Sequence, residues 1–466
     1  MAAEAGETAA SRGQLSLLLQ PPGLAVAIAT VAVAAAFAIY FFGLGRSKER
    51  ALSASDSEVE EEEEASPKNG EVKKAEGAGS KKQKWQQRRE KTQQSTFSHP
   101  LLAATLKAHS SNVTSLDFSN NGKYVATCSD DRTVRIWQSK DFGDRDHKSS
   151  RANVDLDHAT LVRFSPDSRA FIVWLASAET IRIYKMSKKD DGTFAFSVAP
   201  NDFPRKHKAE IINIGIAATG KFVMTASADT TIHLWDLKGE ILATINTNQM
   251  TNAYAAISPC GRFIGSCGFT PDVKVWEVCF AKTGGFREVS RAFELKGHSA
   301  AVHSFGFSND SHRMATVSKD GTWRLWDTDI QYRLQQEPYL LTKGKYEAAT
   351  MAACRLALSP DGRVLALAAG PTVHVFDART ARLMETIVGP HGPEAVLELT
   401  FDPLGRYVAS CGDRAVRVVH NAAGFAAQAE ELEEQARVAP TEAVRDRLRQ
   451  QAKKARQALR QITAVA

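Results

Sequence analysis

Short apolar stretches separated by polar turns repeat along the middle of the chain. Each apolar stretch runs into a turn of the Ser-Pro-Asp-Gly kind, and a basic residue and a second apolar stretch follow. Proline presets φ in such turns, and Gly, Asn or Asp tolerates the left-handed region, so each turn can join two antiparallel strands. The turns lie at residues 119–122, 165–168, 217–220, 258–261, 308–311, 359–362 and 402–405. The pattern predicts seven similar units of short β-strands.

Four side chains recur in a fixed register within these units. In three units a histidine stands 28 residues, a threonine 10 residues and an aspartate 6 residues ahead of a tryptophan. A fourth unit keeps the histidine and the aspartate at the same distances ahead of Val419. The sets are His109, Thr127, Asp131 and Trp137; His207, Thr225, Asp229 and Trp235; His298, Thr316, Asp320 and Trp326; and His391 with Asp413. A period of about 40 to 50 residues with such a strand end predicts a β-propeller.

The recurring set favours a structural role over a catalytic or metal-binding one. Its groups can form a chain of hydrogen bonds inside one blade, where an unpaired buried polar group would cost roughly 1 to 3 kcal/mol. An identical set in separate blades explains packing better than it explains an active site. The even-numbered units lack it, with Glu179, Thr270 with a displaced Asp272, and Gly370-Pro371 in its place, and the last unit has Ala409 and Val419 for Thr and Trp. We expect those blades to be less well cross-linked.

A propeller must close so that no strand edge stays open. Residues 101–106 form one strand too many for the first blade, while the last unit ends near Asn421. We therefore expect the N-terminal strand to complete the seventh blade. The predicted fold class is all-β, a seven-bladed propeller over residues 97–421, with a helical tail over residues 422–466.

A membrane anchor is predicted ahead of the propeller. Residues 24–44 carry no charge, and 21 residues of helix at about 1.5 Å each span one hydrocarbon core. Only Arg12 precedes this segment, whereas Arg46, Lys48 and Arg50 follow it, so the propeller should face the cytosol. A cleaved signal peptide or another targeting element is the alternative. Residues 1–23 form a separate N-terminal segment.

Two further features bear on which side of the membrane the propeller occupies. Sequons begin at Asn112 and Asn309, and they would stay unmodified in the cytosol. The six cysteines form no C-x-x-C pair, so we expect them to be buried thiols in a reducing compartment.

Residues 45–96 have the composition of a disordered linker. An acidic run at residues 56–64 precedes a basic run at residues 68–91, and such blocks of like charge cannot offset chain entropy. Ser53, Ser55 and Ser57 each have an acid three residues downstream, which suits an acidophilic kinase, although an unmodified tether fits equally well. The candidate contacts to an anionic partner, either lipid headgroups or RNA phosphates, are Lys81, Lys82, Lys84, Arg88 and Arg89. Simple solubility is the competing explanation.

The tail carries two oppositely charged helical stretches. Glu430, Glu431, Glu433 and Glu434 precede Pro440, and Thr441 then stands where a helix N-cap belongs. The second stretch has an apolar stripe of Val444, Leu448, Ala455, Leu459 and Ile462. Its other residues include Arg445, Arg447, Arg449, Lys453, Lys454, Arg456 and Arg460. We expect the acidic and basic helices to pair as a hairpin; docking onto a partner or an anionic surface is the alternative.

Overall charge excludes little. The formal net charge is +6 over 466 residues, which favours no class of partner by itself. Four segments longer than a minimal turn, residues 139–150, 187–208, 282–291 and 328–345, are candidate recognition loops or inert insertions.

Five stretches of the chain resemble transducin beta-like members of the WD-repeat family. They are residues 117–124, 156–166, 246–250, 267–278 and 411–417, and the likeness extends to residues 81–84. The resemblance implies a protein of the endoplasmic reticulum membrane with no enzymatic activity and no cofactor. It also implies association with the stress-sensing kinase PERK, a role in the unfolded protein response and translation control, and binding to RNA or ribosome-associated components.

Two other functions remain as alternatives. Adaptors of cullin-type ubiquitin ligases carry a Trp-Asp-x-Arg strand end, which Phe376-Asp-Ala-Arg379 and Trp235-Asp-Leu-Lys238 approach imperfectly. An enzyme would need metal-ligand spacing, a nucleophile elbow or a paired acid site, and the sequence contains no such pattern.

Overall fold

The computed structural model describes residues 97–347 and 354–465. The predicted anchor at residues 24–44 and the linker at residues 45–96, with its candidate phosphorylation sites and basic contacts, lie outside the described residues. Among the described helices, none is both long enough and apolar enough to cross a bilayer.

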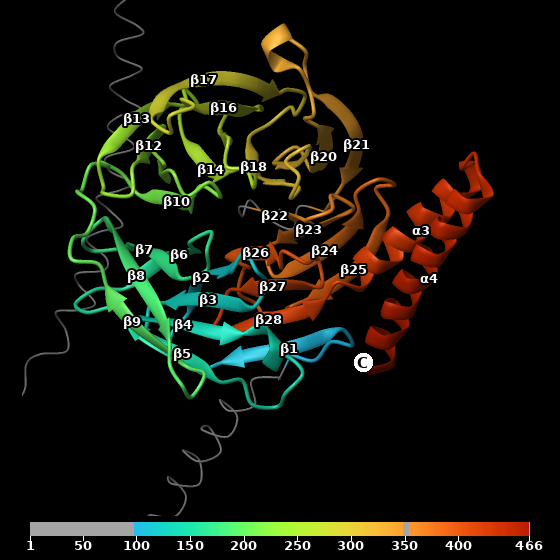
Figure 1. The fold of residues 1–466 in the computed structure, drawn as a ribbon, viewed down its shortest axis with the longest axis horizontal. Coiled ribbons are helices and arrows are strands. Elements are labelled where there is room, and N and C mark those ends of the chain that lie inside the picture. Colours follow the sequence, from blue (N-terminus) through green and yellow to red (C-terminus); the bar gives the residue numbers. More distant parts are fainter. Residues whose placement is uncertain (1–96, 348–353, 466) are drawn as a thin grey trace, which may run out of the picture. The chain divides into compact units, whose positions relative to one another are not determined.

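The described residues form a ring of seven four-stranded antiparallel sheets, or blades (Figure 1). Blade 1 contains β2 (Val113–Phe118), β3 (Tyr124–Ser129), β4 (Thr133–Gln138) and β5 (Ser149–Asn153). Blade 2 contains β6 (Ala159–Phe164), β7 (Ala170–Leu175), β8 (Thr180–Lys188) and β9 (Phe194–Val198). Blade 3 contains β10 (Ile211–Ile216), β11 (Val223–Ser227), β12 (Thr231–Trp235) and β13 (Ile241–Asn246). Blade 4 contains β14 (Asn252–Ile257), β15 (Phe263–Gly268), β16 (Val273–Phe280) and β17 (Phe286–Leu295).

The remaining blades complete the circle. Blade 5 contains β18 (Val302–Phe307), β19 (Arg313–Ser318), β20 (Thr322–Asp327) and β21 (Tyr339–Lys345). Blade 6 contains β22 (Arg355–Leu358), β23 (Val364–Ala369), β24 (Thr372–Asp377) and β25 (Leu383–Val388). Blade 7 contains β26 (Glu398–Phe401), β27 (Tyr407–Cys411), β28 (Ala415–His420) and the N-terminal β1 (Leu102–Lys107). The first strand of each blade contacts the first strand of the next, and β26 contacts β2.

Blade 7 closes the ring as predicted. β1 lies antiparallel to β28, with Leu106 opposite Val416 and Lys107 opposite Ala415. Strands from both ends of the propeller therefore share one sheet. With β1 as its fourth strand, blade 7 is complete.

The apolar core lies between neighbouring blades. One cluster joins Val134 and Ile136 of blade 1 to Phe171 and Val173 of blade 2. The second strand of a blade is covered on both faces, so in β3 five consecutive residues are buried. The outer strands are much less covered, and β13, for example, has a single buried residue.

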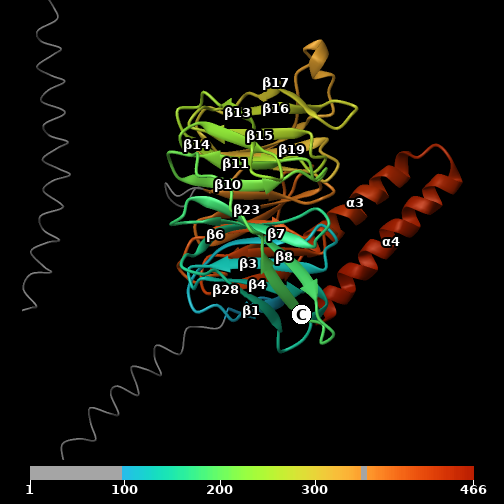
Figure 2. The same cartoon turned by 60° about the vertical axis from the view of Figure 1, so that its left-hand side comes forward.

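Two short turns of helix and a C-terminal helical hairpin complete the structure. The 3-10 turns η1 (Ser139–Asp141) and η2 (Tyr332–Leu334) lie in connections between strands. The helices α3 (Ala422–Val438) and α4 (Glu442–Val465) pack against each other beside the ring (Figure 2). The side chain of Asn421 accepts a hydrogen bond of 2.9 Å from the backbone N–H of Gly424, which caps α3 where β28 ends. The predicted helical hairpin is confirmed.

All four predicted recognition loops contain regular structure. Residues 139–150 include η1 and the start of β5. β9 lies inside residues 187–208, and β21 inside residues 328–345. Residues 282–291 belong to the β16–β17 hairpin, in which Val278 pairs with Val289 beyond the usual end of a blade. Interpretation of residues 282–291 as a loop was wrong because these strands continue pairing past the core.

Candidate interaction surface

In blades 1 and 5 the repeated side chains form a continuous hydrogen-bond chain. His109 Nε2 lies 2.8 Å from Thr127 Oγ1, and His109 Nδ1 lies 2.9 Å from Asp131 Oδ2. Trp137 Nε1 donates to Thr127 Oγ1 over 3.0 Å. Because the indole can only donate, the threonine hydroxyl is free to donate to Nε2, and Nδ1–H then donates to the carboxylate. His298, Thr316, Asp320 and Trp326 repeat this arrangement at 2.8, 3.0 and 3.1 Å.

These groups are buried in a way that suits the neutral imidazole. Burial lowers the pKa of His109 and of His298, and the hydrogen-bonded aspartate partly opposes that effect. Burial acts to raise the pKa of Asp320, but hydrogen bonds from Thr322, the Ser299 backbone and His298 bring it down to about 2. The set is therefore an ionised aspartate joined to a neutral histidine.

Blade 3 brings only part of its set together. His207 Nε2 lies 2.6 Å from Thr225 Oγ1, and Trp235 Nε1 donates to the same hydroxyl over 2.8 Å. Asp229 accepts from Thr231 Oγ1 at 2.6 Å, and that hydroxyl lies 3.4 Å from His207 Nδ1. The ring of His233 lies 4.2 Å from that of His207, centroid to centroid. Burial first and His233 second lower the pKa of His207 to about 4.

Blade 7 uses a hydroxyl that the sequence register does not reveal. His391 Nδ1 lies 2.8 Å from Asp413, while His391 Nε2 lies 3.0 Å from Ser410 Oγ. Ser410 stands one position beyond Ala409, the residue aligned with the threonines of the other blades. Only the presence of a serine next to the expected position could have indicated this substitution.

Blade 4 has a different polar network, which the sequence did not predict. Gln249 Nε2 donates to the Ser266 carbonyl, and Ser266 Oγ donates to Gln249 Oε1, each over 3.1 Å. Lys274 Nζ donates to the carbonyls of Thr247 and Asn248 at 2.9 and 3.1 Å. The expectation of weaker cross-linking fails in blade 4, because Gln249 is fully buried and bonds the loop before β14 to Ser266 of β15 and to the carbonyl of Asp272, just ahead of β16. In blade 2, Asp157 accepts from the backbone N–H groups of the Ser177–Ala178 turn.

A partly buried ion pair links four blades near the ring axis. Arg163 of β6 donates to Glu398 of β26 at 3.0 Å, to Asn213 of β10 at 2.9 Å and to Ser115 of β2 at 3.1 Å. The side chains of Arg163 and Glu398 are 15% and 17% exposed. Nearby, burial raises the pKa of Asp117 to about 6, although Arg163 opposes it. The network ties blades 7, 1, 2 and 3 together at the point of ring closure.

The side chains that commonly bind metals do not cluster in the described part of the chain, and the cysteines differ in their exposure. Within residues 97–347 and 354–465, no group of three or more His, Cys, Asp or Glu side chains is arranged to hold a metal ion. Cys128, Cys267 and Cys411 are buried, but Cys279 is half-buried and Cys260 is exposed, so the prediction that the cysteines are buried is wrong at Cys260. Cys260 lies in the turn between β14 and β15, where one side of the chain faces solvent.

The acidic residues of α3 bond mainly to the propeller rather than to the basic helix. Arg382 Nη2 lies 2.8 Å from both carboxylate oxygens of Glu430. Arg363 pairs with Glu431, and Arg379 pairs with Glu434. Glu430, Glu431 and Glu434 share one face of α3 because a helix turns once in 3.6 residues, and that face meets blade 6. Glu433, which points elsewhere, pairs across the hairpin with Arg456 at 2.7 Å.

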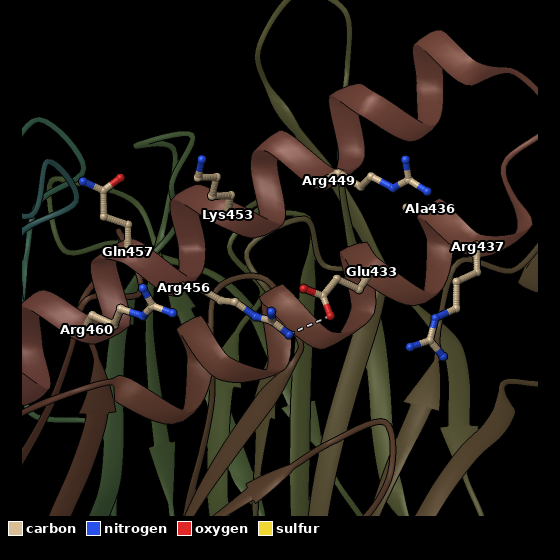
Figure 3. A pocket seen from close by; sticks show the side chains of 8 residues that line it. All are labelled: Glu433, Ala436, Arg437, Arg449, Lys453, Arg456, Gln457 and Arg460. Carbon is tan, nitrogen blue, oxygen red and sulfur yellow. Dashed lines mark hydrogen bonds and ion pairs between the residues drawn. The ribbon is translucent and has the colours of Figure 1, made fainter.

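A cationic groove of about 810 Å³ therefore remains along the hairpin (Figure 3). We call it the tail groove. Its lining residues are Glu433, Ala436 and Arg437 of α3, and Arg449, Lys453, Arg456, Gln457 and Arg460 of α4. The lining thus holds five cationic side chains and one carboxylate, and Figure 3 shows that this carboxylate is turned toward Arg456. Of the predicted basic residues, Arg445 donates to the Ala439 carbonyl instead, and Arg447 and Lys454 lie exposed outside the groove.

The apolar stripe of α4 is buried only in part. Leu459 and Ile462 pack against the cluster that contains Ala427 of α3, whereas Val444 is 43% exposed near the hairpin turn. The hairpin is thus attached to the ring at one end of α4 and extends away from it toward the turn (Figure 2).

The ring of antiparallel blades with these internal sets defines a WD-repeat propeller. The family model of the WD domain, G-beta repeat, matches residues 101–138, 203–236, 290–327 and 382–420, which end at the third strands of blades 1, 3, 5 and 7. These are the blades that carry the histidine and aspartate sets.

The chain belongs to the transducin beta-like protein 2 family. It is 62% identical to the mouse protein of that name over 400 residues, which cover 85% of this chain and 90% of the mouse protein. It is 61% identical to the human protein over 391 residues, which cover 83% and 87% of the two chains. A more distant relative, pre-mRNA-processing factor 19 homolog 2 of Arabidopsis thaliana, is 26% identical over 48% of this chain and 32% of that protein. The chain is thus a WD40 propeller scaffold, a class of protein that binds other proteins.

Proposed function

We propose that this chain is a non-enzymatic scaffold tethered to the endoplasmic reticulum membrane with its propeller in the cytosol. The observation that carries this proposal is that the recurring histidines and aspartates are consumed by hydrogen bonds inside the blades. The groups best suited to acid–base chemistry are therefore engaged in packing, and what the propeller offers a partner is surface. By its resemblance to its family, the scaffold would hold the kinase PERK and serve the unfolded protein response and translation control.

The membrane part of the proposal rests on the sequence. The uncharged residues 24–44 are long enough to span a bilayer, and Arg46, Lys48 and Arg50 on their C-terminal side favour a cytosolic propeller. Asn112 and Asn309 are exposed, so both sequons would be accessible to the glycosylation machinery if the propeller were lumenal. Unglycosylated asparagines at both positions would therefore support a cytosolic propeller.

Topology can be tested in microsomes from cells that express the full chain. We expect added protease to degrade the propeller while the membrane stays intact, and we expect glycosidase treatment to leave the mobility of the chain unchanged. Protection of the propeller, or a mobility shift that disappears in Asn112→Gln, would refute the tethered cytosolic arrangement.

The kinase partner can be tested by precipitation of the full chain from membranes of stressed cells. We expect PERK to co-purify with it, and to be lost when residues 24–44 are replaced by the membrane segment of a protein of another organelle. Absence of PERK from the precipitate of the native chain would refute this part of the proposal.

RNA binding by the linker forms a separate arm of the proposal. Ultraviolet crosslinking should label the full chain with RNA, and reversal of charge at Lys81, Lys82, Lys84, Arg88 and Arg89 should abolish the label. Reversal at Arg447 and Lys454, which are exposed in the tail, is the control. Equal labelling of all three proteins would exclude the linker as the RNA contact.

The alternative, a cullin-type ligase adaptor, gains no support from the strand end that suggested it. Arg379 pairs with Glu434 of α3, so the C-terminal hairpin already occupies the guanidinium that a ligase component would need. At the second strand end, Asp236 accepts from the backbone N–H groups of Lys238 and Glu240, as in an ordinary turn. Loss of a co-purifying ligase on Arg379→Ala would still favour the adaptor.

A further inference from the structure

We propose that the tail groove binds an acidic α-helical segment of a partner protein. The inference goes beyond the scaffold function and depends neither on the membrane anchor nor on the kinase. It follows from the charge of the groove, its length and the chemistry of its walls.

The charges of the groove are compensated only in part. Arg456 pairs with Glu433 and Arg449 Nη1 lies 3.5 Å from Asp446 Oδ1, whereas Lys453, Arg460 and Arg437 form no ion pair among the described residues. Arg449 and Lys453 stand one helical turn apart on α4, and so do Arg456 and Arg460. Like charges at this spacing destabilise a helix. The acidic helix that could have neutralised them directs Glu430, Glu431 and Glu434 to the arginines of blade 6 instead. A ligand that brings carboxylates into the groove would remove this repulsion.

The groove already holds one carboxylate. Glu433 Oε2 lies 2.7 Å from Arg456 Nη2, a distance typical of a charge-assisted hydrogen bond. This contact shows that the walls can bind a carboxylate from a neighbouring helix. The other four lining cations extend the same surface along α4 and onto Arg437.

The length of the cationic row favours a helix as the occupant. Arg460 stands eleven positions after Arg449 on α4, which is about 16 Å at 1.5 Å per residue. A single phosphate or carboxylate covers only a fraction of this row. A helix laid along the hairpin has the same rise per residue, so carboxylates at the spacing of Arg449, Lys453, Arg456 and Arg460 would meet all four cations.

The walls of the groove disfavour nucleic acid and a bilayer surface. None of its eight lining residues is aromatic, whereas proteins that bind single-stranded nucleic acid stack bases on aromatic side chains. A bilayer presents a plane, but these cations line a concave site between two helices, and Arg447 and Lys454 lie outside that lining. Ala436 and the aliphatic stems of the basic residues give an amphipathic helix apolar contact as well.

The proposal can be tested by fluorescence anisotropy with the full chain in detergent micelles. The probe is a labelled alanine-rich helical peptide with glutamates at the spacing of Arg449, Lys453, Arg456 and Arg460, and a matched peptide has glutamine at those positions. We expect the glutamate peptide to bind more tightly, by at least about tenfold at low salt, and to weaken as salt is added.

A matched pair of double variants locates the site. Lys453→Glu with Arg460→Glu reverses two charges inside the groove, and Arg447→Glu with Lys454→Glu reverses two outside it. We expect the first pair to weaken peptide binding by at least about tenfold and the second by less than about twofold. Glu433→Gln should strengthen binding several-fold, because it frees Arg456 for the ligand. Far-ultraviolet circular dichroism of each variant confirms that α3 and α4 remain helical.

Three outcomes would overturn the proposal. The two peptides could bind equally, the two double variants could weaken binding equally, or Glu433→Gln could leave the affinity unchanged. Binding of phosphatidylserine vesicles or of single-stranded RNA that depends on Lys453 and Arg460, with no peptide binding, would assign the groove to that other ligand.

Discussion

His207 should make the stability of the propeller depend on pH more strongly than its counterparts do. The side chain is 7% exposed, and its pKa is lowered from 6.5 to about 4, by burial first and by His233 second. That difference of pKa corresponds to about 3 kcal/mol of unfolding free energy. In blade 5, by contrast, Asp320 lies 3.0 Å from His298 Nδ1 and opposes the effect of burial.

The sign follows from which state binds the proton. Unfolded histidine binds a proton near pH 6.5, while His207 in the folded chain stays neutral down to about pH 4. The full stabilisation is therefore present above pH 6.5, and it is lost progressively as the pH falls from 6.5 to about 4. Below that range both states are protonated, and this group adds no further slope.

The assay is urea unfolding followed by tryptophan fluorescence, repeated across this pH range with the native chain and with His207→Gln. Glutamine can keep a hydrogen bond to Thr225 but has no titrating group. The unfolding free energy of the native chain should fall as the pH drops from 6.5 to 4. In the variant we expect this fall to be smaller by about 3 kcal/mol. His298→Gln is the control and should change the pH profile less. Parallel profiles for the native chain and His207→Gln would refute the reasoning.

Three further changes test the packing of the ring. Arg163→Met should cost about 1 to 3 kcal/mol in urea unfolding, because it removes the charged partner of the partly buried Glu398 carboxylate, which then keeps only the Ser115 hydroxyl at 3.2 Å. Ser410→Ala should cost about 1 to 3 kcal/mol, since it removes the hydroxyl bonded to the histidine of blade 7. Gly344→Ala should lower the melting temperature by several degrees, because a Cβ there would lie 2.2 to 2.4 Å from the indole of Trp323, an overpacking worth about 1 to 3 kcal/mol.

Each of these changes has a control within the chain. Glu398→Leu added to Arg163→Met should recover part of the lost stability. Purely additive losses would contradict an energetic coupling between these two side chains. Ser410→Thr should restore the hydrogen bond that Ser410→Ala removes. Gly143→Ala introduces a Cβ with nothing within 4 Å, so a loss equal to that of Gly344→Ala would show that the cost is not steric.

The repeating turns and the histidine sets carry enough information to predict the ring, since both recur with the period of a blade. Closure by residues 101–106 was also predictable, because an unpaired strand at one end must meet an incomplete blade at the other. The hydrogen-bond partners inside a blade were harder to predict from the sequence. In blade 7 the spacing from histidine to aspartate is 22 residues, as in blade 1, yet the hydroxyl comes from Ser410, one position after the aligned Ala409. A fixed register cannot anticipate such a shift.

Networks that occur once leave no periodic signal. Gln249 and Lys274 of blade 4 are buried and bonded, yet neither recurs in another blade. Asn213 and Glu398 lie far apart in the sequence, and each accepts a hydrogen bond from Arg163 Nη2 of β6. Their pairing depends on the closed circle itself, which is a property of the folded ring and not of any one segment.

The hairpin was predictable, but the ion-pair partners of the acidic residues of α3 were not, because sequence alone offered only the cations of the following helix as neighbours. The blade-6 arginines come close to α3 in the folded ring, and they take three of its four carboxylates. Each of these pairs is at least partly exposed and stabilises the contact by only about 0 to 1 kcal/mol. The apolar packing of Ala427, Leu459 and Ile462 is not screened by salt, so it should hold the hairpin in place when those pairs weaken. Loss of an acidic peptide at high salt would therefore report screening inside the tail groove and not detachment of the hairpin from the ring.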